Sequence, residues 1–398
     1  MTAAPTSLAP FGALSFAYFA SIGVFNPYAP LWFQSLGLST LAIGSIASLQ
    51  SWTRVVMPYA WSWGGDHWGR GAHRVTLLRV AAAAVLAASA LLPFTRTGAT
   101  VTLVVVLLFA ANSAIVPLSE AALAQHLQSG QGGMDMARYG RVRLWGSIGF
   151  IAAVLLLGQW LQWRGIGWMP WFVTGMAVAL LAAAWRLPRA AALAPSAPGA
   201  PAPGVWRVLR QPVVAWFFAG VALTVLAHVA LYVFFSLYLD ALGYGKGAVG
   251  ALWAVSVVGE IVFFWRQGRW FARWDAHGWL VLAALVAALR FAGIALWAAT
   301  AWALVLLQLL HALTFAAQHA ACIALVDRYF HGALRGRGQA LYTTVGYGLP
   351  GVLGGVVGAA VVERWGYPAV FWAAAGAGLL GAACCARSRA LDRRGRPN

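Results

Sequence analysis

The stretch ALWAVSVVGEIVFFW, residues 251–265, is almost entirely apolar, yet Glu260 lies within it. An apolar helix of about 20 residues spans the hydrocarbon core of a bilayer. A carboxylate in that core is costly unless it faces the interior of a helix bundle. Glu260 therefore predicts both a membrane span and a polar interior beside it.

Apolar stretches of this kind recur throughout the 398 residues, which are 62% hydrophobic and 9% charged. Soluble domains carry about 25% charged residues, so the composition predicts a polytopic membrane protein. All spans should be helices, because lipid offers the backbone no hydrogen-bond partner. The start, MTAAPTSLAP, lacks a basic region, and no cleaved signal peptide is expected. The three cysteines predict neither a disulfide framework nor a metal site.

Twelve apolar runs have the length of a membrane-crossing helix. They cover residues 11–34, 41–63, 75–94, 100–126, 140–162, 167–187, 212–240, 247–265, 279–298, 301–326, 338–362 and 367–386. After the sixth run, a segment rich in proline and alanine is typical of a linker. We therefore expect an all-α fold with an N-terminal six-helix half (1–187), a cytoplasmic linker (188–210), a C-terminal six-helix half (211–386) and a cytoplasmic tail (387–398). Two six-span halves are a recurring transporter plan, with the substrate site between them.

The basic residues are distributed unevenly between the loops. Of the 27 lysines and arginines, 21 lie in the loops after even-numbered spans, in the adjoining ends of the spans, or in the tail. Four follow odd-numbered spans, and Arg54 and Arg290 lie deeper within spans. The positive-inside rule then places both termini in the cytoplasm. The net charge of +18 is thus explained by membrane topology and not by nucleic-acid binding.

Five charged residues fall inside predicted spans, namely Arg54, Glu120, Arg143, Glu260 and Arg290. At 1.5 Å per residue, Glu120 and Arg143 lie at similar depths, roughly 5–9 Å from the cytoplasmic face, and should form a pair. Glu260 and Arg290 should form a second pair across an axial offset of roughly 8 Å. Such pairs are either structural or functional, and one pair in each half favours function. His311 adds a titratable group, whereas His228 and His319 are expected to be hydrogen-bonded structural histidines.

The same five residues carry one more positive than negative charge. Arg54 has no partner that the sequence indicates, and a buried cation favours an anion. A monocarboxylate substrate would supply that anion. The first span is rich in aromatic residues on which a flat substrate would stack: Phe16, Tyr18, Phe19, Phe25 and Tyr28.

Several motifs resemble those of the major facilitator superfamily. GGDHWGR, residues 64–70, is similar to its cytoplasmic loop signature through Asp66, Gly69 and Arg70. PLSEAALAQ, YGRVRLWGSIGF, SVVGEIVFF, ALRFAGIA and LLHALTF, which contain Glu120, Arg143, Glu260, Arg290 and His311, are similar to segments of lactose permease. They resemble the phenylpropionate permeases of the same branch still more closely, and Arg54 is shared with these permeases alone.

The resemblance implies roles for individual residues. Glu120 and Arg143 would bind substrate, and Glu260, Arg290 and His311 would couple transport to protons. Asp66, Gly69 and Arg70 would form a cytoplasmic gate. Two positions depart from lactose permease: Thr314 replaces a carboxylate of the proton step, and Phe150 replaces a stacking tryptophan. The second departure argues against a sugar.

The predicted function is therefore proton-coupled import of a small organic solute by alternating access, with Arg54, Glu120, Arg143 and Phe150 binding an aromatic monocarboxylate such as phenylpropionate. No enzymatic activity, cofactor, metal or nucleic acid is expected. The partners are the substrate, protons and lipid, and the protein should work as a monomer in the bacterial inner membrane. The alternatives are symport of a neutral sugar or nucleoside, export by proton antiport, and a non-transporting receptor on the same fold.

Overall fold

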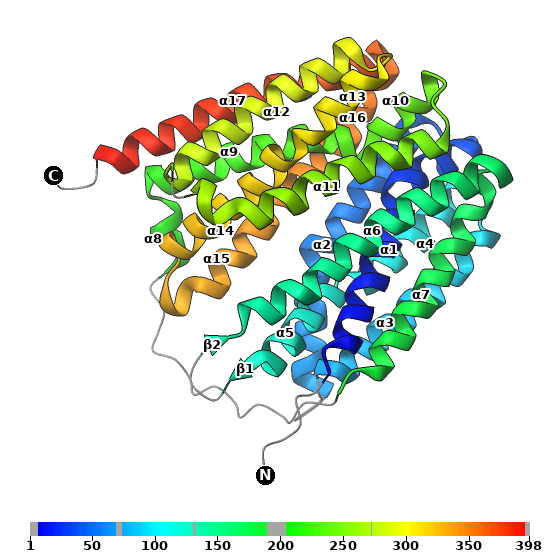
Figure 1. Cartoon of the computed structure of the whole chain (residues 1–398), viewed down its shortest axis with the longest axis horizontal. Helices are drawn as coiled ribbons and strands as arrows, with labels where there is room; N and C mark the ends of the chain where they lie inside the picture. The colour runs from blue at the N-terminus through cyan, green and yellow to red at the C-terminus, as the bar shows by residue number, and fades with distance from the viewer. Residues whose placement is uncertain (1–6, 69–73, 130–132, 189–203, 272, 395–398) are drawn as a thin grey trace. The chain divides into compact units, whose positions relative to one another are not determined.

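The computed structural model describes residues 7–68, 74–129, 133–188, 204–271 and 273–394. Within these ranges the chain is built almost wholly of helices (Figure 1). Eleven helical stretches are long and apolar enough to cross a membrane. They correspond to eleven of the twelve predicted spans, and the remaining prediction, 41–63, is a continuous helix, α2. The prediction of helical spans is confirmed.

By contacts, the helices divide into two compact units. Unit 1 comprises residues 1–38, 56–194 and 245–254, and unit 2 comprises 39–55, 195–244 and 255–398. The predicted halves differ from these units at two places. The first part of α2 packs within unit 2, and the first part of α11 packs within unit 1. Most of the predicted linker, residues 189–203, lies outside the described residues.

The elements up to residue 186 are α1 (Ala9–Ser35), α2 (Thr40–Trp68), α3 (Arg74–Leu91), η1 (Leu92–Phe94), α4 (Gly98–Asn112), α5 (Ile115–Leu127), β1 (Gln128–Ser129), β2 (Gly133–Met134), α6 (Met136–Arg164), η2 (Ile166–Trp168) and α7 (Met169–Arg186). The two short strands pair antiparallel between α5 and α6 and were not predicted. Helix α1 packs against α6 and α7. Gly149 permits this approach, since a Cβ there would lie 2.4 Å from the carbonyl oxygen of Phe16.

The elements from residue 205 onward are α8 (Val205–Leu209), α9 (Pro212–Val229), η3 (Ala230–Phe234), α10 (Phe235–Ala241), α11 (Lys246–Phe271), α12 (Ala276–Trp297), α13 (Ala301–Leu309), η4 (Ala312–Ala317), α14 (Gln318–Tyr329), η5 (Gly332–Leu334), α15 (Arg335–Leu341), η6 (Tyr342–Gly348), α16 (Leu349–Trp365) and α17 (Tyr367–Arg394). Three of them, η3, η4 and η6, are π-helical. Helix α17 packs against α9 and α12.

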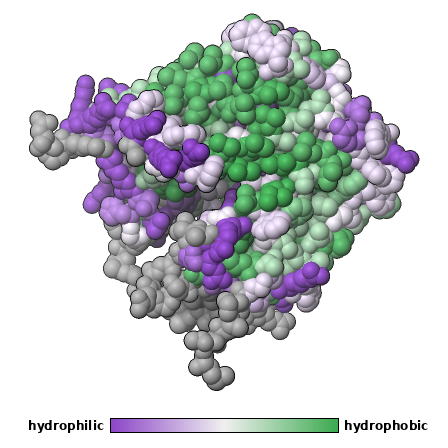
Figure 2. Space-filling model, viewed as in Figure 1, coloured by the Kyte–Doolittle hydropathy of each residue, from purple (hydrophilic) through white to green (hydrophobic). Residues whose placement is uncertain are grey.

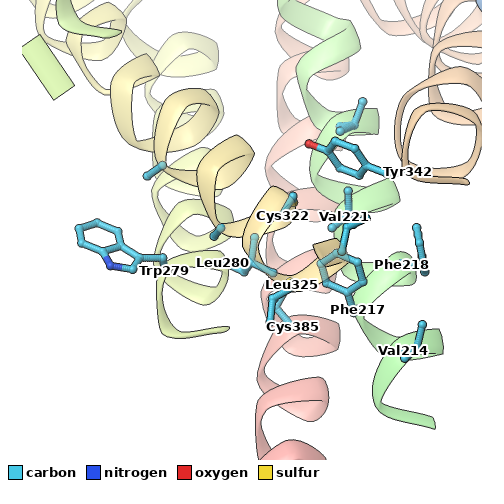
Figure 3. Close-up of a cluster of buried hydrophobic side chains, with 14 of the residues drawn as sticks. Val214, Phe217, Phe218, Val221, Trp279, Leu280, Cys322, Leu325, Tyr342 and Cys385 are labelled. Atoms are coloured by element: carbon cyan, nitrogen blue, oxygen red, sulfur yellow. The ribbon is translucent and has the colours of Figure 1, made fainter. Parts of the chain in front are cut away.

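A cluster of buried apolar side chains lies within unit 2. It brings together side chains of α9, α14, α17 and η6, among them Phe217, Phe218, Cys322, Cys385 and Tyr342 (Figure 3). Outside the core, apolar side chains cover the exposed helix faces, and hydrophilic side chains gather near the C-terminal end of α17 (Figure 2). This surface suits a lipid-embedded bundle.

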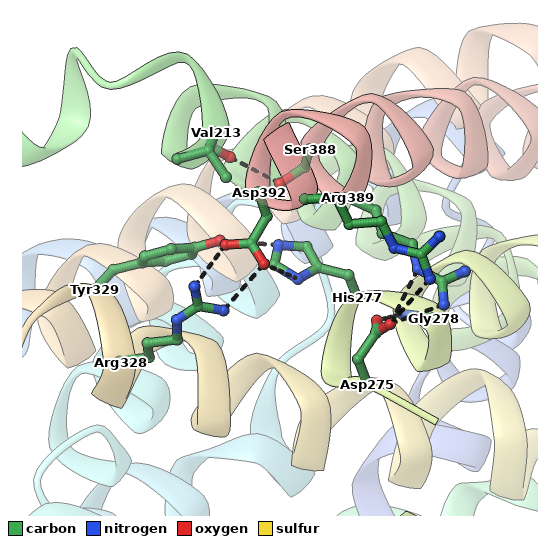
Figure 4. Close-up of polar contacts among 10 residues, drawn as sticks. Val213, Asp275, His277, Gly278, Arg328, Tyr329, Ser388, Arg389 and Asp392 are labelled. Atoms are coloured by element: carbon green, nitrogen blue, oxygen red, sulfur yellow. Dashed lines mark hydrogen bonds and ion pairs between the residues drawn. The ribbon is translucent and has the colours of Figure 1, made fainter. Parts of the chain in front are cut away.

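The predicted cytoplasmic tail, residues 387–398, is helical as far as it is described. Helix α17 continues through it to Arg394. Ion pairs hold this extension: Arg389 Nη2 lies 2.8 Å from Asp275 Oδ2, and Arg328 Nη2 lies 2.6 Å from Asp392 Oδ1 (Figure 4). Burial opposes ionisation of the Asp275 carboxyl, but hydrogen bonds from Arg389 and from the Gly278 amide, with the nearby arginine charges, outweigh it and lower the Asp275 pKa.

Candidate functional site

The predicted pair in unit 1 is confirmed. Arg143 Nη1 of α6 lies 3.2 Å from Glu120 Oε1 of α5. The Phe19 ring of α1 lies 4.9 Å below the guanidinium, and the Tyr139 hydroxyl donates a hydrogen bond to Glu120. The Arg143 and Glu120 side chains are 42% and 32% exposed. Both charged groups are therefore accessible to solvent and to a solute.

A small cavity of about 30 Å³ adjoins this pair. That volume holds water but not a ring-containing solute. It is lined by residues of α1, α5 and α6: Phe11, Leu14, Ser15, Tyr18, Phe19, Ile115, Val116, Ser119, Glu120, Leu123, Val142 and Arg143. The aromatic residues of α1 thus divide by role: Tyr18 and Phe19 face the cavity, whereas Phe25 and Tyr28 are buried in helix packing.

Phe150 of α6 lies elsewhere in unit 1. It is 9% exposed, and its ring centroid lies 6.4 Å from that of Trp253 at the start of α11. Its aromatic partner in this structure is therefore a protein side chain.

Arg290 is the centre of the site in unit 2. It lies on α12 and is fully buried, with 0% exposure. Its Nε–H donates to the carbonyl oxygen of Leu307 at 2.9 Å, and its Nη2–H donates to Gln308 Oε1. Its Nη1 donates to His311 Nδ1 at 2.8 Å and to Thr314 Oγ1 at 3.3 Å. Every nitrogen of this buried guanidinium is hydrogen-bonded, as a buried charge requires.

His311 lies between Arg290 and Glu260. Arginine can only donate, so His311 Nδ1 must accept and the ring proton of the neutral imidazole is on Nε2. This Nε2–H donates to Glu260 Oε1 of α11 at 3.0 Å. The expected direct pair of Glu260 with Arg290 is therefore wrong in detail. The axial offset between the two residues is filled by the imidazole.

Thr314 extends the same network to His228. Thr314 Oγ1 accepts from Arg290 and its hydroxyl donates to His228 Nε2 at 3.0 Å. His228 Nδ1–H donates in turn to the carbonyl oxygen of Thr224 at 2.8 Å. This confirms the expected hydrogen-bonded role of His228. Thr314, where the resemblance predicts a carboxylate, connects Arg290 to a neutral imidazole.

The helix geometry around this network is irregular. His228 lies two residues before the π-helical segment η3, and Thr314 lies within the π-helical segment η4. A π-helical turn shifts the register of side chains on one face, and such turns are common at functional sites. Here the register brings His311 and Thr314 together on Arg290.

Arg54 differs from its prediction in environment. It lies on α2 and its side chain is exposed, whereas burial was expected. It interacts electrostatically with Tyr232 of η3. Of the predicted gate residues, Asp66 lies in the last turn of α2, and Gly69 and Arg70 lie outside the described residues.

Sequence reasoning missed two partners of the network. Gln308 accepts from Arg290, and the Ser256 hydroxyl donates to Gln308 Oε1 at 2.8 Å. Ser256 lies one helical turn before Glu260, and Gln308 lies three residues before His311. The helical spacing of these polar residues on apolar spans was a usable signal.

The network responds chemically to one proton. As a carboxylate, Glu260 accepts a charge-assisted hydrogen bond from His311. A proton on Glu260 removes the charge and weakens the connection of α11 to His311 and Arg290.

A bundle of membrane-spanning helices with hydrogen-bonded ionisable groups in its interior is the design of a multi-pass membrane transporter. The chain belongs to the MFS_1 like family, whose model matches residues 11–373. This confirms the resemblance to the major facilitator superfamily.

Two known transporters are similar in sequence to this protein over most of its length. The "Probable 3-phenylpropionic acid transporter" of Escherichia coli (strain K12) is 30% identical over 354 residues, 84% of this chain and 85% of the relative. The "Maltose permease" of Geobacillus stearothermophilus is 29% identical over 377 residues, 89% of this chain and 88% of the relative. Both names describe transporters and not enzymes.

Solved structures confirm the fold. The nucleoside transporter NupG superposes with a TM-score of 0.79 at 18% identity, covering 96% of this chain and 98% of that one. The peptide transporter POT superposes with a TM-score of 0.79 at 13% identity, covering 98% and 95%. The predicted all-α membrane fold is therefore confirmed.

Proposed function

We propose that this transporter is a proton-coupled symporter that imports an aromatic monocarboxylate, such as a phenylpropionate, by alternating access. The observation that supports proton coupling is the series of hydrogen bonds from Glu260 through His311 to Arg290. The Glu260 side chain is only 16% exposed and accepts a hydrogen bond from His311. The buried guanidinium of Arg290 fixes the orientation of that imidazole. Glu260, Arg290 and His311 are the proposed coupling residues.

In this proposal the proton cycle follows the state of Glu260. The carboxylate binds a proton and loses its charge-assisted bond to His311. Release of that proton restores the bond. Transport is coupled because the network holds α11 to α12 and α13 more strongly when Glu260 is ionised than when it is protonated.

The substrate assignment is supported by the similarity to the "Probable 3-phenylpropionic acid transporter" and by the exposed guanidinium groups. Arg54 and Arg143 both present exposed side chains, and a guanidinium binds a carboxylate through two parallel hydrogen bonds. The Phe19 ring beside Arg143 offers a face on which an aromatic substrate can stack. Glu120 and Phe150 complete the proposed substrate-binding set.

The test is uptake of labelled phenylpropionate into vesicles, with and without an imposed pH gradient. The protonated acid crosses lipid unaided, so the initial rate above protein-free vesicles is compared, and not the steady state. We expect saturable uptake that the gradient stimulates. The amide of phenylpropionate should not compete, and Arg54→Lys should weaken binding of the acid, since an ammonium lacks the planar fork. Equal competition by acid and amide would contradict the substrate assignment.

A neutral sugar or nucleoside is the second candidate, favoured by the similarity to the maltose permease. The two substrate classes differ in net charge movement. One proton with one carboxylate is electroneutral, whereas one proton with a sugar carries a positive charge. Stimulation of uptake by membrane potential alone would support the neutral substrate. Uptake that responds only to the pH difference supports the acid.

Orientation is part of the same proposal. The arginine-rich loops and both termini lie in the cytoplasm, as the positive-inside rule predicts. The protein acts as a monomer in the bacterial inner membrane, with its substrate, protons and lipid as partners. Asp66, Gly69 and Arg70 act as a cytoplasmic gate. Accessibility of cysteines introduced into the tail and into the loop at Arg96 tests this orientation.

A further inference from the structure

A third histidine lies next to the network in unit 2. His311, Phe315 and His319 follow one another at four-residue spacing through η4 into α14. Their rings stack, with centroids 5.3 Å and 6.2 Å apart and interplanar angles of 11° at both steps. His319 therefore lies on the same helix face as His311, in the first turn of α14. It is partly exposed, whereas His311 is buried.

The other two histidines have fixed hydrogen-bond roles. His311 accepts from a guanidinium on one nitrogen and donates to Glu260 from the other. His228 donates to a backbone carbonyl and accepts from a threonine hydroxyl. Neither Arg290 nor a carbonyl can reverse its role. A second proton on His311 would also face the buried charge of Arg290 directly.

His319 has a partner whose role can reverse. Its Nδ1 lies 3.1 Å from the Tyr342 hydroxyl, which lies 3.1 Å from the Tyr347 hydroxyl. A hydroxyl both donates and accepts. Tyr342 can therefore donate to a neutral His319, or accept from a protonated His319 while donating to Tyr347. This arrangement accommodates both charge states of the imidazole without moving a helix.

Charged and titratable groups reach His319 from each neighbouring element. Glu260 on α11 interacts with it electrostatically, as it does with Arg290 of α12. Tyr342 faces it from η6 and is hydrogen-bonded to Tyr347, and Cys322 of α14 interacts with Tyr342. The carboxylate of Glu260 is the anion in this set, so it favours a positive charge on His319.

We propose that His319 is a second proton-carrying residue, whose charge state is linked to that of Glu260. This inference rests on the proposed proton coupling. When protonated Glu260 releases its proton to water and neutral His319 takes one up, an O–H bond of the carboxyl breaks and an N–H bond forms on the imidazole, so that two neutral groups become a carboxylate and an imidazolium. The total charge is unchanged, and the new ion pair offsets the cost of separating charge. The imidazolium then gives its proton to water at its exposed edge.

The first test needs no substrate. Protein labelled with ¹⁵N-histidine in lipid nanodiscs is titrated by NMR, and the His319 resonance is assigned from its loss in His319→Gln. We expect this resonance to titrate between about pH 5 and pH 9, and those of His228 and His311 to remain constant. Glu260→Gln should move its midpoint by on the order of one pH unit, since a neighbouring charge is lost. A His319 resonance that does not titrate, or a midpoint unchanged by Glu260→Gln, would overturn the proposal.

The second test measures transport of labelled phenylpropionate. His319→Gln and Tyr342→Phe should each lower the gradient-stimulated initial rate, by roughly tenfold or more for His319→Gln, and leave counterflow within about threefold. The matched control is His331→Gln, which removes an exposed histidine of the loop after α14. A wild-type protein that ignores the gradient would contradict the proposed function itself. A gradient-dependent wild type with an unaffected His319→Gln variant would contradict only this inference.

Discussion

Replacing Glu260 by glutamine tests the coupling mechanism most directly. The amide oxygen still accepts from His311 Nε2–H, so the shape of the network is kept and only the charge is removed. The contacts of 3.0 Å and 2.8 Å on either side of the imidazole place the carboxylate and the guanidinium of Arg290 roughly 8 Å apart. At an effective dielectric constant of about 20, their attraction is about 2 kcal/mol.

This attraction sets the size of the expected effect. About 2 kcal/mol corresponds to roughly a thirtyfold linkage between the protonation of Glu260 and the position of Arg290. In the glutamine variant no proton binds at this position, and the linkage is absent. We therefore expect gradient-stimulated uptake to fall to the unstimulated rate. Counterflow, which needs no net proton movement, should remain within a few-fold of wild type.

The assay is the initial rate of labelled phenylpropionate uptake into proteoliposomes, with protein-free liposomes as background. Asp327→Asn is the matched control, because it also neutralises a carboxylate, but one in an exposed pair with Arg335. The control should keep its response to the gradient. If Glu260→Gln responded to the gradient as wild type does, Glu260 would not be the coupling residue, and Glu120 would become the candidate.

Three further outcomes follow from the described contacts. The double change Glu120→Ala with Arg143→Ala should show a coupling of about 0.2–1 kcal/mol in substrate binding, since both side chains are partly exposed; strict additivity would show that they do not interact. Thr314→Val should lower the melting temperature by an amount equivalent to about 1–3 kcal/mol, because Arg290 and His228 each lose a buried partner, and Thr314→Ser should not. Asp275→Asn should destabilise the protein near neutral pH, because the Asp275 pKa is lowered by its arginine contacts. This difference from wild type should be lost as the pH falls below the ordinary value of 3.8, where the aspartate itself takes up a proton; a difference that persists in acid would contradict the ionic role.

Much of the fold follows from the sequence, because a bilayer imposes a simple length rule on apolar segments. The same rule gives depth, and equal depth predicted the pair of Glu120 with Arg143 that the structure shows. Depth also showed that Glu260 and Arg290 are offset, but it could not show which side chain fills the gap. His311 fills this gap. Predicting that would require knowing which helix faces Glu260 and Arg290.

Other contacts left no local trace in the sequence. His228 and Thr314 are 86 residues apart, and a hydrogen bond between two spans is not encoded in the periodicity of either one. The π-helical segments are equally hidden, because a one-residue shift in register does not change the pattern of a helix that is apolar on most faces. The contacts of the C-terminal arginines are hidden in the same way, because their partner Asp275 lies more than one hundred residues earlier in the sequence.

The hydrogen bonds of Arg290 also affect how the protein is inserted into the membrane. All four of its acceptors, at Leu307, Gln308, His311 and Thr314, belong to the next span along the chain. A lone arginine at this depth would cost at least about 2.5 kcal/mol during insertion. The hairpin of α12 with the span of α13, η4 and α14 satisfies the guanidinium by itself, before α15–α17 are synthesised. The two spans should therefore leave the translocon as a pair, and the order of charges along the chain serves biogenesis as well as transport.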